Sequence, residues 1–203
     1  MDKTSCEQLC AVAEAAFRDS IAVKESLCGM GFGLVIEMAE MIAAAFNRGH
    51  RLFLFGNGGS AADAQHVAAE FVNRFQLERR PLPALALTVD TSILTSISND
   101  YQFEDVFLKQ LQALGQAGDV ALGITTSGRS PNVLKALQWA RENGLRTLGW
   151  AGAETTEMDA CCDLILHIPS RVTARVQECH ITFAHVLCQL VEEMLFGATR
   201  SEP

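Results

Sequence analysis

The stretch LFLFGNGGSAADAQHVAAEF, residues 52–71, decides the fold of this 203-residue chain. It begins with four apolar residues, turns through the glycine-rich segment 56–60, and continues with apolar residues at helical spacing. An unbroken apolar run is typical of a strand that is buried on both faces, as strands are in a parallel sheet covered by helices. The strand–turn–helix unit therefore predicts an α/β fold.

The rest of the chain repeats this alternation. Further short apolar runs at 84–89, 120–124, 145–150 and 164–168 predict four more strands, and helical patterns separate several of them. Helices are expected at about 5–27, 32–47 and 173–196, the last one ending at Gly197 as its C-cap. We expect a single domain over residues 1–203. An N-terminal helical arm would cover 1–50, and about five parallel strands with the C-terminal helix would cover 51–197.

Composition excludes several classes of protein. The net charge of −8 argues against a nucleic-acid surface, which needs an excess of Lys and Arg to neutralise phosphates. The apolar run 29–46 is interrupted by Glu37 and Glu40, so no membrane span is expected, and the N-terminus lacks the pattern of a signal peptide. Seven cysteines without a C-x-x-C motif are typical of reduced thiols in the cytoplasm, where we expect the protein to act.

Two loops that follow predicted strands have the composition of a phosphate-binding cradle. In the first, Asn57, Gly58 and Gly59 allow close backbone approach, and Ser60 with Asp63 forms a capping-box pattern at a helix start. The second loop, at 125–130, carries hydroxyl groups on Thr125, Thr126, Ser127 and Ser130, with Gly128 and Arg129 between them. Pro131 follows as a first helical residue. Hydroxyls and free helix N–H groups bind phosphate without an obligatory lysine.

Other interpretations of these segments stay open at this point. Gly56, Gly58 and Ala61 satisfy a dinucleotide-binding pattern, but the acidic residue that ends the next predicted strand, Asp90, lies well beyond the required spacing. An ordinary strand–turn–helix corner also fits the first loop. Asn99 and Asp100 follow the second predicted strand, and such residues either bind sugar hydroxyls or close turns with their own backbone.

Residues with acid–base or metal-binding capacity lie on two predicted helices. His66 and Glu70 are four residues apart and share one helical face, as in a metal-binding pair, an acid–base pair or a plain surface pair. Gln177 and His185 lie on one stripe of the last helix, about 12 Å apart along its axis. They reach one metal only by leaning strongly toward each other. Otherwise they contribute to sites in different subunits.

Taken together, these motifs resemble the phosphoheptose isomerases of the SIS (sugar isomerase) family. The matching segments are GNGGSAADAQHVAAEF at 56–71, the pair Asn99 and Asp100, TTSGRS at 125–130, and RVQECHITFAH at 175–185. The likeness extends from the N-terminal helices to Phe196. It implies a three-layer SIS fold and an aldose–ketose isomerase that converts sedoheptulose 7-phosphate to D-glycero-D-manno-heptose 7-phosphate. That reaction is the entry to heptose biosynthesis for lipopolysaccharide or related glycans.

The resemblance also implies the site. Glu70 and His185 match the catalytic acid–base residues, and one Zn²⁺ per subunit is implied at His66, Glu70, Gln177 and His185. The implied substrate contacts are Asn57, Gly58, Gly59, Ser60, Asn99, Asp100, Thr125, Thr126, Ser127, Ser130 and Gln177. The family is a cytoplasmic homotetramer with active sites at subunit interfaces, and its partner is a phosphorylated sugar, with no nucleic acid and no membrane.

Some residues depart from the family pattern. Thr125 stands where serine is usual, Arg129 stands where asparagine is usual, and the segment 151–162 lacks a common glycine-rich turn. Two competing functions are a non-catalytic adaptor for the replication initiator protein, whose members resemble segment 72–87, and an isomerase of another phosphosugar. The adaptors lack the full carboxylate–histidine set that is present here, and isomerases of other phosphosugars usually carry extra regulatory modules.

Overall fold

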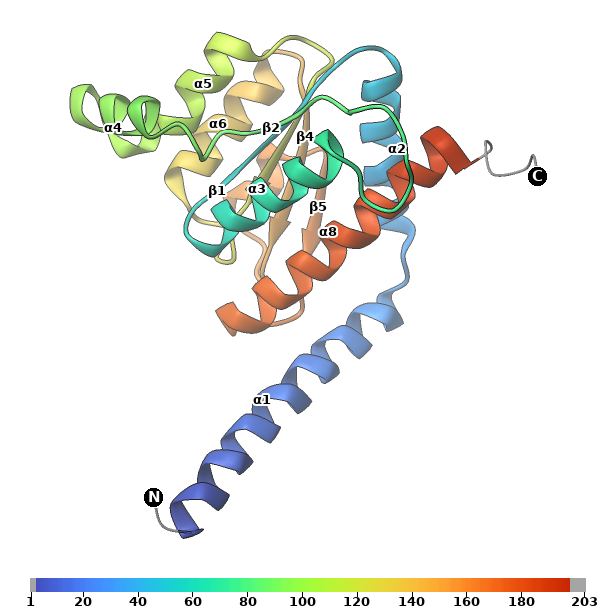
Figure 1. Ribbon diagram of the computed structural model, residues 1–203. Helices are drawn as coiled ribbons and strands as arrows, with labels where there is room; N and C mark the ends of the chain where they lie inside the picture. The colour runs from blue at the N-terminus through green and yellow to red at the C-terminus, as the bar shows by residue number, and fades with distance from the viewer. Residues whose placement is uncertain (1–2, 198–203) are drawn as a thin grey trace.

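A computed structural model describes residues 3–197 and contains a five-stranded sheet in which every strand pair is parallel. The strands are β1 (Leu52–Gly56), β2 (Ala84–Ala86), β3 (Val120–Ile124), β4 (Arg146–Ala151) and β5 (Leu164–His167), in the spatial order β2-β1-β3-β4-β5. The α/β class and the parallel sheet expected from the sequence are confirmed (Figure 1).

Burial of both sheet faces explains why the strands are continuous apolar runs. Every residue of β1 and β3 is buried. Leu52 and Leu54 pack into a core on one face, while Phe53 and Phe55 pack into a second core on the other face. Because successive side chains of a strand point to opposite faces, only a sequence that is apolar at every position fills both cores.

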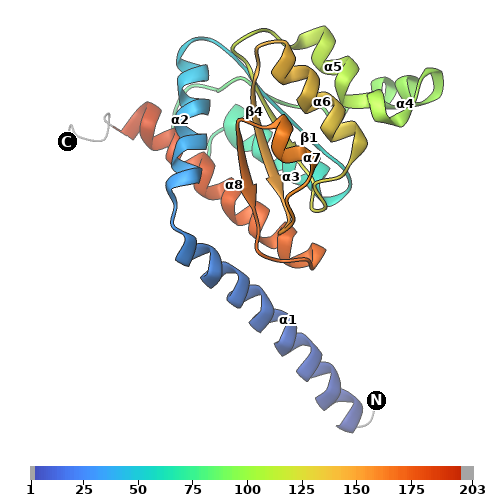
Figure 2. The same ribbon diagram turned by 180° about the vertical axis from the view of Figure 1, so that it is seen from behind.

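Helices cover both faces of the sheet. One layer holds α2 (Gly33–Asn47), α3 (Gly59–Val72) and α8 (Thr173–Phe196), and the opposite layer holds α5 (Val106–Leu114), α6 (Pro131–Glu142) and the short α7 (Glu157–Cys161). Helix α4 (Thr91–Asp100) and the 3₁₀ turn Phe103–Asp105 adjoin α5. Figure 1 shows α3 and α8 in front of the sheet, and the reverse view in Figure 2 shows α6 and α7 in front.

Two predicted boundaries and one predicted cap were wrong in detail. Strand β2 ends at Ala86, three residues before the prediction, because the chain turns there after Leu87 donates one further hydrogen bond to Leu54. Helix α3 begins at Gly59 after Gly58, whose φ of 57° lies in the left-handed region. Ser60 is therefore buried in the first turn rather than capping it, and the predicted capping box with Asp63 does not form.

Helix α1 (Lys3–Met30) leaves the body of the molecule as an arm, as both views show (Figures 1 and 2). Large apolar side chains on the arm are exposed, among them Leu9, Val12, Phe17 and Ile21. Within residues 3–197, no single helix is long and apolar enough to cross a membrane, and only the bent pair of α1 and α2, with 77° between them, meets the length and composition criteria together.

The strand order places a topological switch point between β1 and β3. From β1 the chain goes outward to β2 on one side, and it returns to add β3, β4 and β5 on the other side. In such sheets the loops at the carboxyl ends of the two strands at the switch point diverge and leave a crevice, which is where ligands bind. The two loops singled out from the sequence are the ones that follow β1 and β3.

His180 is a fully buried histidine on α8, beside the Trp150 ring in the core. Its Nε2 lies 3.3 Å from the carbonyl oxygen of Ala151, and its Nδ1 has no hydrogen-bond partner. Burial lowers the pKa of His180 from 6.5 to about 4, with the bond to Ala151 opposing that shift. The folded protein therefore keeps this ring neutral at pH values where the unfolded chain is protonated.

We expect acid to destabilise the protein through His180. The pKa of His180 is lower in the folded protein than in the unfolded chain. Its contribution to the free energy of unfolding is therefore present above about pH 6.5 and is lost between there and pH 4. It amounts to about 2 kcal/mol between pH 7.5 and 5. Urea unfolding at fixed protein concentration measures the free energy of unfolding. Over this pH range that free energy should fall less for His180→Leu than for the wild type. An unchanged loss of the free energy of unfolding in His180→Leu would contradict the assignment.

Candidate active site

A polar cavity of about 310 Å³ lies at the carboxyl ends of β1 and β3. The two strands are paired in register, with Gly56 opposite Ile124, so the loops that follow them face each other. The cavity is lined by Asn57, Gly58, Gly59, Ser60, Ile124, Thr125, Thr126, Ser127, Ser130, Thr173 and Gln177. The structure thus brings both predicted cradle loops and Gln177 into one site.

Two helix N-termini point their positive ends at this cavity. Gly58 precedes α3 and Ser130 precedes α6, and neither helix is capped by a side-chain hydrogen bond. Ser130 at the N-cap and Pro131 at the first helical position are as predicted. Free N–H groups at the start of a helix, reinforced by the helix dipole, bind anions. The cavity therefore favours a phosphate group despite the acidic charge of the whole protein.

Hydroxyl groups and an amide pair shape the cradle walls. The Thr125 hydroxyl lies 2.8 Å from that of Ser130 and 3.3 Å from that of Ser127. Asn57 and Asn132 exchange two hydrogen bonds of 2.9 Å, which join the start of α3 to the start of α6. Thr125 is buried, so its hydroxyl is held in one orientation rather than free in solvent. Rigid donors of this kind are suited to recognising a tetrahedral anion.

Gln177 closes the cradle from α8. Its side-chain amide lies so close to Gly59 that a Cβ atom at that position would overlap it. Thr173, one helical turn earlier on the same face, also lines the cavity. Thr173 was not among the site residues predicted from the sequence, although its i, i+4 spacing to Gln177 was a usable signal.

Further along α3 and α8, three other candidates come together. His66 and His185 face each other with their Nε2 atoms 2.9 Å apart, and the Glu70 carboxylate lies 3.4 Å from Nε2 of His66. The predicted proximity of His66 and Glu70 on one face is confirmed. The ring of Phe75 stacks on His185, with centroids 5.7 Å apart. We call His66, Glu70 and His185 the histidine–carboxylate cluster.

The cluster has the donor chemistry of a zinc site. Two imidazoles and one carboxylate are a common ligand set of catalytic zinc, which leaves a fourth position open. Within residues 3–197, no group of three or more His, Cys, Asp and Glu side chains is arranged as a metal site in this conformation. The fourth implied ligand, Gln177, lies at the cradle, eight residues or about 12 Å along α8 from His185. Three of the four implied ligands therefore lie together, and one does not.

Asp63 is a candidate that the sequence analysis explained only as a cap. It lies one turn before His66 on α3, and its Oδ2 atom is buried without a hydrogen-bond partner. Burial raises the pKa of Asp63, and the nearby His66 opposes that shift. An unpartnered buried carboxyl oxygen is costly, and a carboxyl group with a raised pKa is a candidate acid–base residue. Asp63 is such a candidate on α3, between the cradle and the cluster.

Asn99 and Asp100 lie away from the cavity within a single chain. They are exposed at the end of α4, and Asn99 donates a 2.8 Å hydrogen bond to Asp100. Asp90, which precedes them, caps α4 by accepting a bond from the Ile93 N–H. A role for Asn99 and Asp100 in substrate binding stays a prediction.

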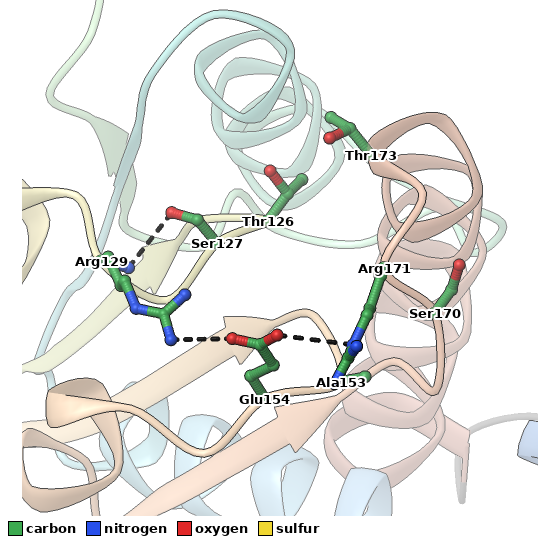
Figure 3. Close-up of a pocket in the computed structure, with 8 residues that line it drawn as sticks. All are labelled: Thr126, Ser127, Arg129, Ala153, Glu154, Ser170, Arg171 and Thr173. Atoms are coloured by element: carbon green, nitrogen blue, oxygen red, sulfur yellow. Dashed lines mark hydrogen bonds and ion pairs between the residues drawn. The ribbon is translucent and has the colours of Figure 1, made fainter.

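A second cavity of about 190 Å³ adjoins the cradle and shares Thr126, Ser127 and Thr173 with it (Figure 3). Arg129 turns its guanidinium toward Glu154, at 2.7 Å, and Arg171 approaches the same carboxylate at 3.4 Å. The hydrogen bond and charge of Arg129, together with Arg171, hold the pKa of Glu154 below its ordinary value. The charge that Arg129 adds is thus partly neutralised and lies beside the cradle, not inside it.

Comparison with known proteins gives one consistent family. The model of the SIS domain matches residues 32–152. The chain is similar to a phosphoheptose isomerase of Nitratidesulfovibrio vulgaris strain Miyazaki F, with 59% identity over 80% of this chain and 78% of the relative. It is also similar to that of Aquifex aeolicus, with 51% identity over 88% of this chain and 94% of the relative.

Solved structures agree with these relatives. The phosphoheptose isomerase of Neisseria gonorrhoeae superposes with a TM-score of 0.87 at 39% identity, covering 91% of this chain and 99% of the other. That of Francisella tularensis gives 0.87 at 32% identity, covering 90% and 97%. At 12% identity and a TM-score of 0.65, the Vibrio vulnificus NanR protein shares only the fold.

We expect Gly59→Ala to weaken phosphate binding at the cradle by about tenfold, since the added methyl group displaces the Gln177 amide. The dissociation constant for inorganic phosphate, from ³¹P NMR titration, checks this. Gly33→Ala is the matched control, because a Cβ atom at Gly33 meets no atom within 4 Å. Equal phosphate affinity of Gly59→Ala and the wild type would show that Gln177 does not shape the cradle.

Proposed function

Since this chain belongs to the SIS domain family and to its phosphoheptose isomerases, we propose that it interconverts sedoheptulose 7-phosphate and an aldoheptose 7-phosphate. The observation that carries the proposal is the placement of a phosphate cradle and a histidine–carboxylate cluster along the same pair of helices. Gly59 meets Gln177 at the cradle and His66 meets His185 at the cluster, so α3 and α8 run side by side in the same direction.

The separation of the two parts suits a long substrate. His66 lies seven positions after Gly59 on α3, which is about 10 Å of helix. A heptose phosphate carries its phosphate at carbon 7 and reacts at carbons 1 and 2, so the whole chain length lies between the two ends. The cradle fixes the phosphate, and binding energy from that remote group positions the reacting carbons.

Isomerisation needs a proton to move between adjacent carbons. In the ketose-to-aldose direction, a base takes a proton from carbon 1 and an enediol forms. A proton is then delivered to carbon 2, while the oxygen-bound proton passes from O1 to O2. Glu70 and His185 divide this work in our proposal, with Glu70 as the carbon base and His185 serving the oxygens. His66 contacts both the carboxylate of Glu70 and the ring of His185, which orients them.

We further propose one zinc ion per subunit, held by His66, Glu70 and His185 before substrate binds; Glu70 would act as the base only once released from the metal, since zinc lowers the basicity of a bound carboxylate. Zinc would supply Lewis-acid polarisation of the substrate carbonyl. The resemblance also implies Gln177 as a ligand. From its place at the cradle, Gln177 joins a metal site only after a rearrangement or in another subunit.

An adaptor without catalytic activity is the competing function. It requires no cluster of proton-transfer groups, whereas His66, Glu70 and His185 contact one another in a single chain. The relatives reported above at 30% identity or more are all named phosphoheptose isomerases. An isomerase is therefore the function that the site supports best.

We expect Glu70→Gln to lower kcat by about 10²–10⁴-fold, because an amide cannot accept the carbon-bound proton. NMR of purified protein with sedoheptulose 7-phosphate follows the aldoheptose product directly. Loss of product on chelation, restored by added Zn²⁺, would assign zinc a catalytic role. Unreacted ketose with folded, zinc-loaded wild-type protein would refute the isomerase, and full activity in Glu70→Gln would refute the role of that carboxylate.

We propose that the α1 arm assembles the protein, and that the oligomer is the homotetramer the resemblance implies. An amphipathic helix gains its stability from packing its apolar face, and Val12 and Phe17 on α1 are 67% and 74% exposed. A second copy of the chain, which carries the same apolar stripe, covers these side chains symmetrically. The resemblance implies active sites at subunit interfaces, so we expect Asn99 and Asp100 of a neighbouring subunit to approach the cavity in the assembled protein.

We expect Phe17→Asp to reduce the oligomer to smaller species, because a charge is costly in an apolar interface. Light scattering coupled to size exclusion measures the mass directly. The change Gln8→Asp, at another exposed position of the same helix, is the control and should keep the wild-type mass. A wild-type protein that elutes as a monomer would refute the assembly proposal.

A further inference from the structure

A buried ion pair lies between the α3–β2 connection and α8. Arg79 and Glu192 are 1% and 2% exposed, and Nε of Arg79 lies 3.0 Å from the Glu192 carboxylate. Burial would raise the pKa of Glu192, but hydrogen bonds from three backbone N–H groups and the charge of Arg79 bring it below its ordinary value. The pair is therefore ionic inside the protein, and such a pair persists only when its remaining hydrogen-bonding capacity is satisfied.

That capacity is satisfied by one segment, residues 70–80. The Glu192 carboxylate accepts hydrogen bonds from the successive N–H groups of Phe75, Gln76 and Leu77, each within 3.0 Å. The Arg79 guanidinium donates to four carbonyl oxygens, those of Glu70, Phe71, Asn73 and Arg80. One pair thus fixes the backbone of the connection and caps the C-terminus of α3.

Both ends of this network touch the histidine–carboxylate cluster. Arg79 binds the carbonyl oxygen of Glu70 itself at 2.8 Å, and Glu192 holds the N–H of Phe75, whose ring stacks on His185. Glu192 also lies two helical turns after His185 on α8. The network therefore reaches the cluster from α3 on one side and from α8 on the other.

We propose that the Arg79–Glu192 pair is the positioning element of the cluster, acting on Glu70 through the end of α3 and on His185 through the Phe75 ring. Neither residue contacts the cavity or the cluster side chains, so both are positioning residues and not catalytic ones. The inference rests on the proposed function only for the reaction that is measured. The cradle lies at the opposite end of α3 and α8, so the pair governs the chemical step rather than phosphate binding.

The first test is the kinetics of Glu192→Gln with sedoheptulose 7-phosphate. Misplacement of Glu70 and His185 should lower kcat by about 10–100-fold, while KM stays within about threefold of the wild type. Leu111→Ala, a buried truncation on the other sheet face, supplies a loss of stability without touching the network and should keep kcat. A kcat in Glu192→Gln equal to that of Leu111→Ala, or a loss confined to KM, would overturn the proposal.

The second test is independent of activity. The chain has five histidines, so imidazole NMR of metal-free, histidine-labelled protein gives five ring signals. Glu192→Gln should move the signals of His66 and His185 and leave those of His50 and His167 in place. Glu192→Asp keeps the buried negative charge but shortens its reach to the N–H groups of Phe75 and Leu77, so it remains informative even if Glu192→Gln does not fold, and it should also move His66 and His185.

Unmoved His66 and His185 signals in both variants, or equal shifts at all five rings, would overturn the positioning role. If these signals move as expected while the wild type leaves the ketose unreacted, the positioning role stands and the proposed reaction falls.

Discussion

The pairing of β1 with β3 is the constraint on which the site depends. The two strands are separated by more than sixty residues of chain, yet they are registered so that Gly56 lies opposite Ile124. This register brings two loops and two uncapped helix N-termini to the same edge of the sheet. Neither loop alone would bind an anion with specificity. Their juxtaposition concentrates backbone dipoles and hydroxyls in one cavity, which explains how an acidic protein provides a place for phosphate.

Periodicity predicted the sheet and the long helices well, because burial on both faces leaves an unmistakable apolar pattern in segments such as 52–55 and 120–124. The predicted last helix, 173–196, matches α8 at both ends. The capping of α3 was predicted wrongly, because the left-handed conformation of Gly58 is a property of the backbone that Ser60 and Asp63 do not reveal. Local patterns report local preferences, and they fail where a glycine starts the helix earlier.

The candidate site could likewise be predicted only where its contacts lie within one helix. Sequence spacing was enough to pair His66 with Glu70, since both lie on one helix. It could not show that His185 meets His66, or that Gln177 meets Gly59, because these contacts depend on how α3 lies against α8. The Phe75 ring and the Arg79–Glu192 pair were out of reach for the same reason. Their effect on the cluster passes through a loop whose conformation arises only after the helices have packed.

The contact between Gly59 and Gln177 has a consequence for how such proteins can diverge. Any side chain larger than hydrogen at position 59 occupies the space that the amide of residue 177 now fills. A change at either position therefore alters the effect of changes at the other, although 118 peptide bonds separate them along the sequence. Because the overlapping atoms are the end of a flexible side chain, a larger residue at 59 would move the amide rather than block folding, so the two positions are coupled through the shape of the cavity and not through stability.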